Sequence, residues 1–399
     1  MKKVFCIMAS AVLFAAMANA AVGFATQPYL QTMTPTSVTI MWVTSGSKQV
    51  TGWVEYGEGN STSIEAFDYT RGLKQAFTNI YRVHLTNLTP GTTYSYKAKI
   101  REITGFVGNT SLTWGDTYET STYTFTTPAA DATSASCVVL SDIHSQDTCL
   151  HTLLERAGIT LRDYDFLMLN GDMLNAVPNE AEVIHHLLVP YADLTQSSMP
   201  FFFTRGNHEY RNKFARHLLD YVETGEDNEG FYAFSWGPCR FIVLDTGEDK
   251  ADSDKEYNGL VDTEAYRASQ VDWLREQLTS DAYREAKFKI IFMHIPFYSN
   301  TATARYAVED CRNLFLPLVS QYAPDVVISG HTHKAGVLEA DATHPFPIVF
   351  GGGKDFTDNK RDYCPAAIVL RATDNAMELN VINYYGENKG TVRVAHTAD

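Results

Sequence analysis

A chain of 399 residues is longer than one hydrophobic core usually organises, so its length predicts two domains. Hydrophobic residues make up 45% of it, which is ordinary for a globular protein. The formal net charge of −15, from 32 basic and 47 acidic residues, disfavours non-specific nucleic-acid binding, which needs basic residues to neutralise phosphates. This charge does not exclude a small phosphorylated substrate, because bound metal ions can outweigh a distant surface charge.

Residues 1–20 are predicted to form a signal peptide that directs export. Lys2 and Lys3 give a positively charged start, a mostly apolar run follows, and positions 18–20 read Ala-Asn-Ala, a small-residue cleavage site. Cleavage would start the mature chain at Ala21 and place the protein in a periplasm or in the medium. The apolar run is short for a permanent anchor, and no later stretch is long and apolar enough to span a bilayer.

Removal of the signal peptide leaves an odd number of cysteines: Cys137, Cys149, Cys239, Cys311 and Cys364. An odd number cannot be fully paired within one chain, and none of them shows the C-x-x-C spacing of a zinc knuckle. We therefore expect buried free thiols, with one disulfide bond as the alternative.

Residues 21–128 are predicted to form an all-β sandwich. The run 37–43 alternates polar and apolar residues as a half-buried strand does, and similar short runs follow near 51–57, 81–85 and 123–127 with turn residues between them. The motif L-x-P-G-T-x-Y-x-Y at 88–96 and the early Trp42 resemble a fibronectin type III domain. No cluster of catalytic residue types lies here, so we expect a cover or spacer, with glycan or surface binding as the alternative.

Residues 135–399 are predicted to form a layered α/β domain after a linker rich in Ala, Ser and Thr at 128–136. Nearly continuous apolar runs alternate with segments of helical period near 148–158, 180–195, 209–222, 263–278 and 306–322. Apolar strands that alternate with helices are typical of a sheet covered by helices. The chain returns to strands after 348, most clearly at 376–385.

Five of the apolar runs are followed at once by residues that bind metals: Asp142 and His144, Asp172, Asn207, His294, and His331 and His333. Side chains at the carboxyl edge of a sheet emerge where ligands bind. Residues at i and i+2 of an extended chain point the same way, so Asp142 and His144 can reach one metal together. Asp172 is the natural bridge between two metals, because its carboxylate has two oxygens. The mixture of oxygen and imidazole nitrogen suits manganese, iron or zinc better than calcium.

This ligand set favours phosphate ester chemistry. Two divalent ions, set against two carboxylates and a metal-bound hydroxide, leave about one positive charge to attract a phosphate. Such a pair of metals generates hydroxide from water and clamps phosphate oxygens. His208 stays free of metal in this scheme and is predicted to contact the phosphate or protonate the departing oxygen, with Glu209 as its orienting partner.

The motifs D-x-H at 142–144, G-D at 171–172, G-N-H-E at 206–209, His294 and G-H-x-H at 330–333 resemble the calcineurin-like metallophosphoesterase superfamily. With the sandwich in front, Q-x-x-W-L-x-x-x-L at 270–278 and H-x-P-x-Y at 294–298, the chain resembles purple-acid-phosphatase-like enzymes. The resemblance implies α/β/β/α layering. It implies one metal held by Asp142, His144, Asp172 and His333. It implies a second metal held by Asp172, Asn207, His294 and His331.

The sequence departs from purple acid phosphatases at two positions. Those enzymes have glycine where this chain has His144, and tyrosine where it has Asn175. Without a phenolate on ferric iron the purple colour is expected to be absent, and the first metal need not be ferric.

These features predict an exported dinuclear-metal enzyme that hydrolyses phosphate monoesters by attack of metal-bound hydroxide. Asn207, His208 and Tyr298 are the predicted substrate contacts. The segment 247–262, rich in acidic residues, Gly and Asn, is either a pocket wall or a surface loop. The alternatives are a phosphodiesterase acting on nucleotides or lipid headgroups, and a non-catalytic binder of a surface or glycan.

Overall fold

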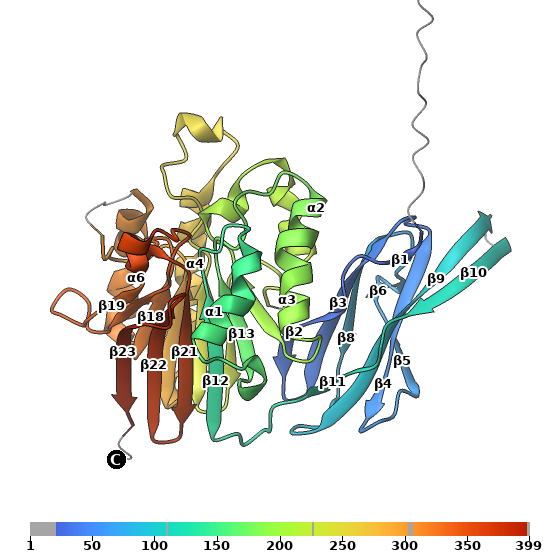
Figure 1. The fold of residues 1–399 in the computed structure, drawn as a ribbon, viewed down its shortest axis with the longest axis horizontal. Coiled ribbons are helices and arrows are strands. Elements are labelled where there is room, and N and C mark those ends of the chain that lie inside the picture. Colours follow the sequence, from blue (N-terminus) through green and yellow to red (C-terminus); the bar gives the residue numbers. More distant parts are fainter. Residues whose placement is uncertain (1–20, 109–110, 226, 302–305, 397–399) are drawn as a thin grey trace, which may run out of the picture.

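The computed structural model describes residues 21–108, 111–225, 227–301 and 306–396. The predicted signal peptide lies outside these described residues. An N-terminal β-rich domain stands beside a larger domain in which helices cover sheets (Figure 1). This arrangement confirms the predicted order of an all-β domain followed by a layered α/β domain.

The N-terminal domain contains two main sheets. One sheet is formed by β1 (Gly23–Phe24), β2 (Tyr29–Thr34), β3 (Ser37–Ser45) and β8 (Ile80–Leu85). The other is formed by β4 (Val50–Glu58), β5 (Ile64–Phe67), β9 (Thr93–Val107), β10 (Ser111–Glu119) and β11 (Tyr123–Thr126). A short hairpin joins β6 (Tyr69–Thr70) to β7 (Leu73–Lys74). Trp42 and Tyr81 stack in the space between the sheets, with ring centroids 5.2 Å apart.

Strand β3 is buried on both faces, although its alternating sequence predicted a half-buried strand. Val38, Ile40 and Trp42 pack inside the sandwich, as the alternation predicted. Met41 and Val43 point to the other face and join the core of the α/β domain. The second domain therefore covers a face that would otherwise meet water.

The α/β domain contains two six-stranded sheets. The first runs in the order β14 (Phe201–Thr204), β13 (Phe166–Asn170), β12 (Ser134–Leu140), β21 (Ala366–Thr373), β22 (Ala376–Asn383) and β23 (Asn388–Ala395). The second runs in the order β15 (Tyr232–Trp236), β16 (Cys239–Leu244), β17 (Phe288–Met293), β18 (Val326–Ser329), β20 (Ile348–Phe350) and β19 (Gly336–Leu338). Strands β12 to β14 are mutually parallel, and so are β16, β17, β18 and β20.

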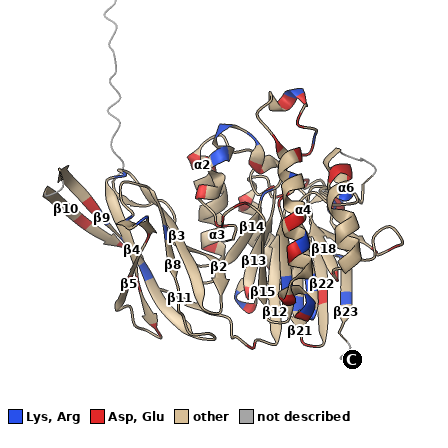
Figure 2. Cartoon of the chain, turned by 180° about the vertical axis from the view of Figure 1, so that it is seen from behind, with Lys and Arg blue, Asp and Glu red and all other residues tan. Residues whose placement is uncertain are grey.

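Helices cover the outer face of each sheet, which gives four layers. The first sheet packs against α1 (Leu150–Arg156), α2 (Glu180–Val183) and α3 (Val189–Leu194), the last two joined by a π-helical turn at Ile184–Leu188. The second packs against α4 (Thr263–Thr279), α5 (Asp281–Glu285) and α6 (Tyr306–Tyr322). A third apolar cluster fills the space between the sheets. Acidic and basic residues are interspersed along the ribbon of α4 (Figure 2).

The predicted helices agree with the structure except at 209–222. That segment forms two 3-10 helices, Asn207–Tyr210 and Lys213–Asp220, because the backbone of Asn212 between them has a φ of 80°. Asparagine tolerates this left-handed conformation better than most residues, and it interrupts a continuous helix. Further 3-10 turns lie at Asp147–Cys149, Leu161–Asp163, Lys255–Tyr257 and Asp358–Tyr363.

The expectation of free thiols is confirmed, because all five cysteines between Cys137 and Cys364 are buried and unpaired. In the described part of the chain no helix combines the length and the apolar character that a membrane crossing requires.

The two domains are joined through strand β2, which lies along the edge strand β14 (Figure 1). The fully buried Gln31 side chain links them: its Nε2 donates to the carbonyl of Phe201 at 2.7 Å, and its Oε1 accepts from the N–H of Glu223 at 2.9 Å. The Tyr29 hydroxyl donates to the carbonyl of Tyr221 at 2.7 Å. These bonds satisfy one carbonyl on the edge strand β14 and two backbone groups in the segment that follows residue 220, which would otherwise lack partners.

We predict that Gln31→Leu lowers the free energy of unfolding by about 1–3 kcal/mol, because it leaves the Phe201 carbonyl and the Glu223 N–H without their side-chain partner. Urea denaturation followed by circular dichroism measures the change. Gln49→Leu is the matched control, since Gln49 is exposed. Equal stabilities of the two variants would contradict a stabilising role for the Gln31 contacts.

Candidate metal centre

The predicted ligands converge at one place, where the carboxyl ends of strands from both sheets meet. Strands β12, β13 and β14 belong to the first sheet, while β17 and β18 belong to the second. The two sheets are joined here by the Asp142 carboxylate, which accepts the backbone N–H of His331 at 3.0 and 3.1 Å. The His294 carbonyl also accepts the N–H of Gly330 at 3.0 Å. The ligand-bearing loops are therefore tied to one another and to the strands before them.

Five of the predicted ligands have a backbone φ between 51° and 67°: Asp142, His144, Asp172, His331 and His333. The expectation that residues at i and i+2 share a direction because the chain is extended is therefore wrong in its geometry. The loops turn at both positions, and this turning directs the side chains inward. Left-handed conformations of non-glycine residues cost about 1–3 kcal/mol each and persist where function requires them.

A first group of ligand-type atoms comes from Asp142, His144, Asp172 and His333, which offer atoms within 4.8 Å of one another. The Nε2 atoms of His144 and His333 are 3.0 Å apart, and His333 Nε2 is 3.4 Å from Asp142 Oδ1. These are the four residues that the family resemblance assigns to one metal.

A second group lies on the other side of Asp172. His294 Nε2 is 3.2 Å from Asp172 Oδ2 and has no hydrogen-bond partner. Its Nδ1 is 2.9 Å from the Asn170 carbonyl, which can only accept, so Nδ1 carries a proton and Nε2 is the ring nitrogen that faces the site. A hydrogen bond from the ring nitrogen that faces away from the metal is the usual way in which a protein orients a metal-binding histidine. His331 Nδ1 lies 2.9 Å from Asn207 Oδ1 in the same region.

The pKa shifts of these groups favour a positive charge at the site. Burial lowers the pKa of His144 to about 2, so this imidazole is neutral, the form that binds metals. Burial acts in the same direction on His294, but the carboxylates of Asp172 and Asp142 overcome it and raise the His294 pKa to about 10. Burial acts to raise the pKa of Asp172, and the neighbouring His294 charge holds that pKa well below its usual range. Burial raises the pKa of Asp142. These nitrogen and oxygen atoms fit metal cations, because a cation supplies the positive charge that a proton on His294 would otherwise provide.

Close backbone approach explains the glycines beside the ligands. A Cβ at Gly206 would lie 2.2 Å from Asp172 Oδ1, and one at Gly171, whose φ is 84°, would lie 2.5 Å from His294 Nδ1. Only a residue without a side chain leaves room for both ligands.

Glu209 acts on the loops rather than on His208. Its fully buried carboxylate accepts the backbone N–H groups of Asp172 at 2.7 Å, Leu174 at 2.9 Å and Gly206 at 2.7 Å. The expectation that Glu209 orients the His208 ring is corrected by these contacts, because the 3-10 turn directs the two neighbouring side chains apart. Burial and the Asp172 charge raise the pKa of Glu209 to about 7.

His208 is instead oriented by a backbone carbonyl. Its Nδ1 is 2.7 Å from the Asn175 carbonyl, and its Nε2 is 2.7 Å from Arg211 Nη1 and 3.9 Å from Asp172 Oδ2. Burial lowers the pKa of His208, although the Asp172 charge opposes this. The ring stands edge-on to His144, with centroids 4.4 Å apart, so it borders the ligand groups.

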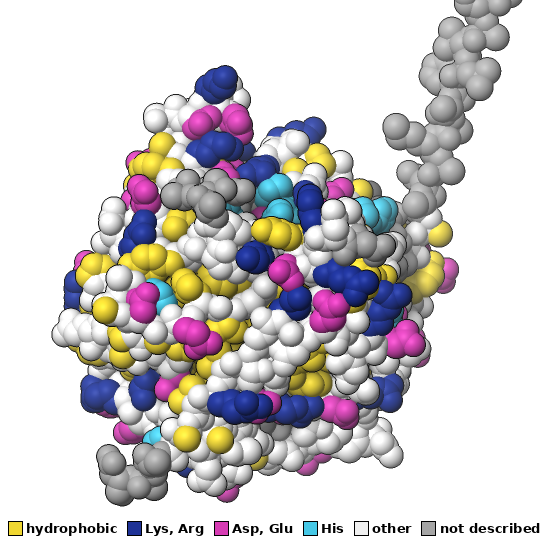
Figure 3. All heavy atoms as spheres, turned by 60° about the vertical axis from the view of Figure 1, so that its left-hand side comes forward, with side chains coloured by type: hydrophobic (Ala, Val, Ile, Leu, Met, Phe, Trp, Pro, Cys, Tyr) yellow, Lys and Arg dark blue, Asp and Glu magenta, His cyan; other side chains and the backbone are white. Residues whose placement is uncertain are grey.

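A cavity of about 480 Å³ opens over these side chains. Its walls include Asp172, Asn207, His208, Arg211, Asp249, Lys250, Tyr306, His331 and His333. Histidines and basic side chains lie next to one another near the top of the face in Figure 3. Sequence reasoning missed Arg211 and Tyr306. The position of Arg211 two residues after the G-N-H-E motif could have pointed to it. Lys250 lies in the segment 247–262, which was predicted to be either a pocket wall or a surface loop.

Among the described residues, Tyr298 does not line this cavity, and its assignment as a substrate contact stays a prediction. Its ring lies 5.0 Å from that of His344, and the Arg312 guanidinium lies 4.8 Å above it. It packs at the edge of the core between the second sheet and its helices. Arg205, which precedes the G-N-H-E motif, forms an ion pair with the buried Asp245 at 2.6 Å.

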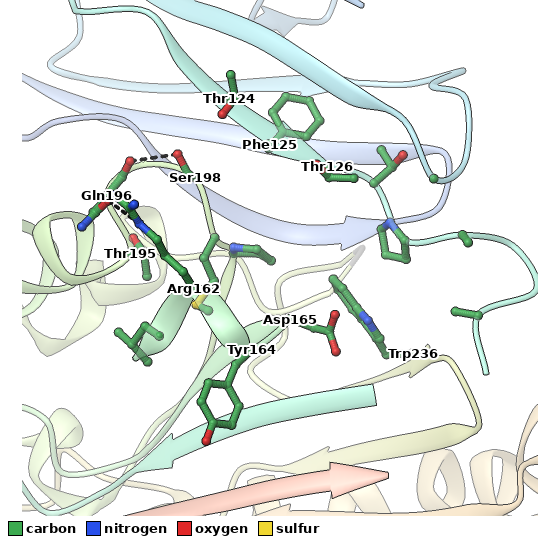
Figure 4. Close-up of a pocket in the computed structure, with 18 of the residues that line it drawn as sticks. Thr124, Phe125, Thr126, Arg162, Tyr164, Asp165, Thr195, Gln196, Ser198 and Trp236 are labelled. Atoms are coloured by element: carbon green, nitrogen blue, oxygen red, sulfur yellow. Dashed lines mark hydrogen bonds between the residues drawn. The ribbon is translucent and has the colours of Figure 1, made fainter. Parts of the chain in front are cut away.

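A larger cavity, about 770 Å³, lies between the two domains at the opposite edge of the first sheet. Thr124, Phe125 and Thr126 face Arg162, Tyr164, Asp165 and Trp236 across it (Figure 4). Asp165 precedes β13, so this cavity borders the amino ends of the strands, away from the ligand groups. In the described residues the group of four metal-capable side chains lies at the carboxyl ends instead.

Comparison with known proteins agrees with this geometry. A family model described as calcineurin-like phosphoesterase matches residues 136–335. The chain belongs to the calcineurin-like phosphoesterase family. A second model, described as the purple acid phosphatase N-terminal domain, matches residues 26–127. As a member of this family, the chain is a metal-dependent phosphoric ester hydrolase.

Relatives of this phosphoesterase cover both domains. Purple acid phosphatases 21 and 22 of Arabidopsis thaliana are each 24% identical over 78% and 79% of this chain, and 67% and 68% of their own lengths. A purple acid phosphatase of Glycine max is 22% identical over 79% of the chain and 65% of its own length.

Solved structures share the fold. The purple acid phosphatase PPD1 of yellow lupin (Lupinus luteus) superposes with a TM-score of 0.63 at 15% identity, over 92% of this chain and 74% of its own. A structure of PhoD superposes with a TM-score of 0.59 at 14% identity, over 93% of this chain and 89% of its own.

We predict that Glu209→Gln reduces metal content and activity together, by about 10- to 100-fold in apparent affinity and rate, because an amide cannot accept all three backbone N–H groups. Metal titration and a phosphatase assay on the same samples measure both. Glu276→Gln, at an exposed helix position, is the control. Full metal content with a slower turnover would instead indicate that Glu209 acts on His208.

Proposed function

We propose that this phosphoesterase is exported and hydrolyses phosphate monoesters at a dinuclear centre of manganese, iron or zinc. The ligands we propose for one ion are Asp142, His144, Asp172 and His333. The ligands we propose for the other are Asp172, Asn207, His294 and His331. The protein would act on a small phosphorylated substrate.

The position of Asp172 Oδ2 carries this proposal. The atom lies 3.7 Å from His144 Nε2 in the first ligand group and 3.2 Å from His294 Nε2 in the second. Its partner Oδ1 accepts the His208 N–H at 2.8 Å, which fixes the carboxylate in this orientation. A carboxylate held between two sets of nitrogen donors supports a bridging role, because one anion then serves two cations.

Bound metals would supply a nucleophile from water at neutral pH and neutralise charge on the phosphate. The remaining roles belong to the chain itself. Asn207 provides a neutral oxygen beside His331, which limits the negative charge at the site. Arg211 lies on the cavity wall, where it can contact a phosphate, and His208 borders the same cavity with its Nε2 2.7 Å from Arg211 Nη1. The adjacent basic side chains Arg211 and Lys250 favour a doubly charged monoester over a singly charged diester.

The position that carries a tyrosine in purple acid phosphatases holds Asn175 here. Its side-chain oxygen lies 3.5 Å from Lys354 Nζ, and its carbonyl faces His208. No phenolate is available from this residue, which supports a centre without the tyrosinate-to-iron colour. The same reasoning leaves manganese or zinc as good candidates for the first ion.

We further propose that residues 21–128 serve as a cover for the catalytic domain, which begins near 135. Strand β2 occupies the free edge of β14 and thereby supports the strand that leads to Asn207. Export rests on the charged, apolar and small-residue pattern of residues 1–20.

We predict that Asp172→Ala lowers bound metal from two ions per chain to at most one, and lowers phosphatase activity by more than about 100-fold, because it removes the bridging carboxylate. Elemental analysis of purified protein and hydrolysis of p-nitrophenyl phosphate with added manganese, zinc or iron measure both effects. Asp193→Ala is the control, since that carboxylate is 71% exposed. A metal-replete variant with full activity would refute the bridging role. A wild-type protein that hydrolyses no phosphate monoester would refute the proposed function.

A further inference from the structure

An arginine next to the metal-binding loop occupies the place from which a phosphate would be recognised. Arg211 directly follows the 3-10 helix Asn207–Tyr210 and lines the same cavity as Asp172 and His331. Its Nη1 lies 2.7 Å from His208 Nε2. The guanidinium and the His208 ring therefore lie side by side on the cavity wall.

The hydrogen bonds of His208 leave it no N–H for a substrate. The Asn175 carbonyl can only accept, so His208 Nδ1 is the donor in the 2.7 Å contact between them. Arg211 can only donate, so His208 Nε2 is the acceptor in the contact with Nη1. Both ring nitrogens are thus used, so N–H donors for a substrate at this wall come from the neighbouring basic side chains, Arg211 and Lys250.

The contacts of Arg211 with its protein neighbours do not use all of its N–H groups. A guanidinium carries five N–H donors. Three are directed at His208, Glu248 Oε1 and Asp249 Oδ1, at 2.7, 3.5 and 3.5 Å. The remaining two lie on the two terminal nitrogens, one on each. Two donors on the same planar guanidinium can both be directed at one phosphate oxygen.

The Arg211 guanidinium is held in place by two buried carboxylates. Glu248 and Asp249 have side chains that are 1% and 8% exposed, so neither moves freely in solvent. The Tyr257 hydroxyl lies 3.1 Å from Glu248 Oε2 and 3.2 Å from Asp249 Oδ1, which ties both carboxylates to the loop that carries them. A guanidinium that is already oriented loses little conformational freedom when it binds a ligand.

We propose that Arg211 is the residue that selects phosphate monoesters over diesters, by binding the third non-bridging oxygen of a terminal phosphate. This inference rests on the proposed function, because it assumes that phosphate esters bind over the ligand groups. A monoester phosphate has three non-bridging oxygens and two negative charges, so one oxygen remains for Arg211 after two face the metal-binding residues. A diester has an esterified oxygen there, which accepts a hydrogen bond poorly and brings an organic group into the wall.

The test compares Arg211→Gln and Arg211→Lys with the wild-type protein on two substrates, p-nitrophenyl phosphate and bis(p-nitrophenyl) phosphate. Arg211→Gln is expected to lower kcat/KM for the monoester by about 10- to 100-fold, the size of a lost charge-assisted contact, and to change that for the diester by less than about threefold. The inhibition constant of inorganic phosphate rises in parallel. Arg211→Lys restores only part of the monoester rate, because lysine keeps the charge but not the fork.

Arg162→Gln is the matched control, because Arg162 lies at the distant interdomain cavity. Metal content and circular dichroism of each variant verify that the centre and the fold are intact; if Arg211→Gln does not fold, the ratio of the two rates in Arg211→Lys decides. A parallel loss on both esters, or an unchanged monoester rate, overturns the role of Arg211. A wild-type protein inactive on both esters overturns the proposed function itself, and one that prefers the diester overturns its monoester part.

Discussion

Buried lone pairs that face one another repel unless a cation lies between them, and this constraint governs the centre of the protein. The Nε2 atoms of His144 and His333 are 3.0 Å apart, and the Nε2 of His294 is buried without a hydrogen-bond partner. Two carboxylates share the same space, at Asp142 and Asp172. A chain that gathered these groups for packing alone would lose stability by doing so. Metal cations turn the same contacts into ligand bonds, so the arrangement is stable when the site holds metal.

The fold is organised to hold these groups against their mutual repulsion. The parallel strands of the two mixed sheets end at the same edge, and the Asp142 carboxylate accepts the His331 N–H across them. Glu209 binds three backbone N–H groups of the neighbouring loops. The N-terminal domain contributes from a distance, because Gln31 satisfies the free edge of the strand that precedes Asn207. Rigid strands and bonded loops keep the left-handed ligand residues in conformations that they would not adopt alone.

The order of the domains and the converging strand ends were predictable, because strand and helix patterns and apolar runs that stop at Asp, Asn or His are local signals. The α/β/β/α layering was implied by the family resemblance. Other features depend on contacts that no local pattern records. The burial of Met41 and Val43 arises from the second domain. The separation of Glu209 from His208 arises from a 3-10 turn. Arg211 and its anchoring carboxylates meet only in the folded chain, since they come from segments far apart in the sequence.

Anomalous X-ray diffraction from crystals grown with manganese tests the central claim most directly, because it locates the ions without reference to activity. The account predicts two peaks on either side of the Asp172 carboxylate. One peak should lie among Asp142, His144 and His333, and the other among Asn207, His294 and His331. A single peak, or peaks at which Asp172 is not a shared ligand, would contradict the account.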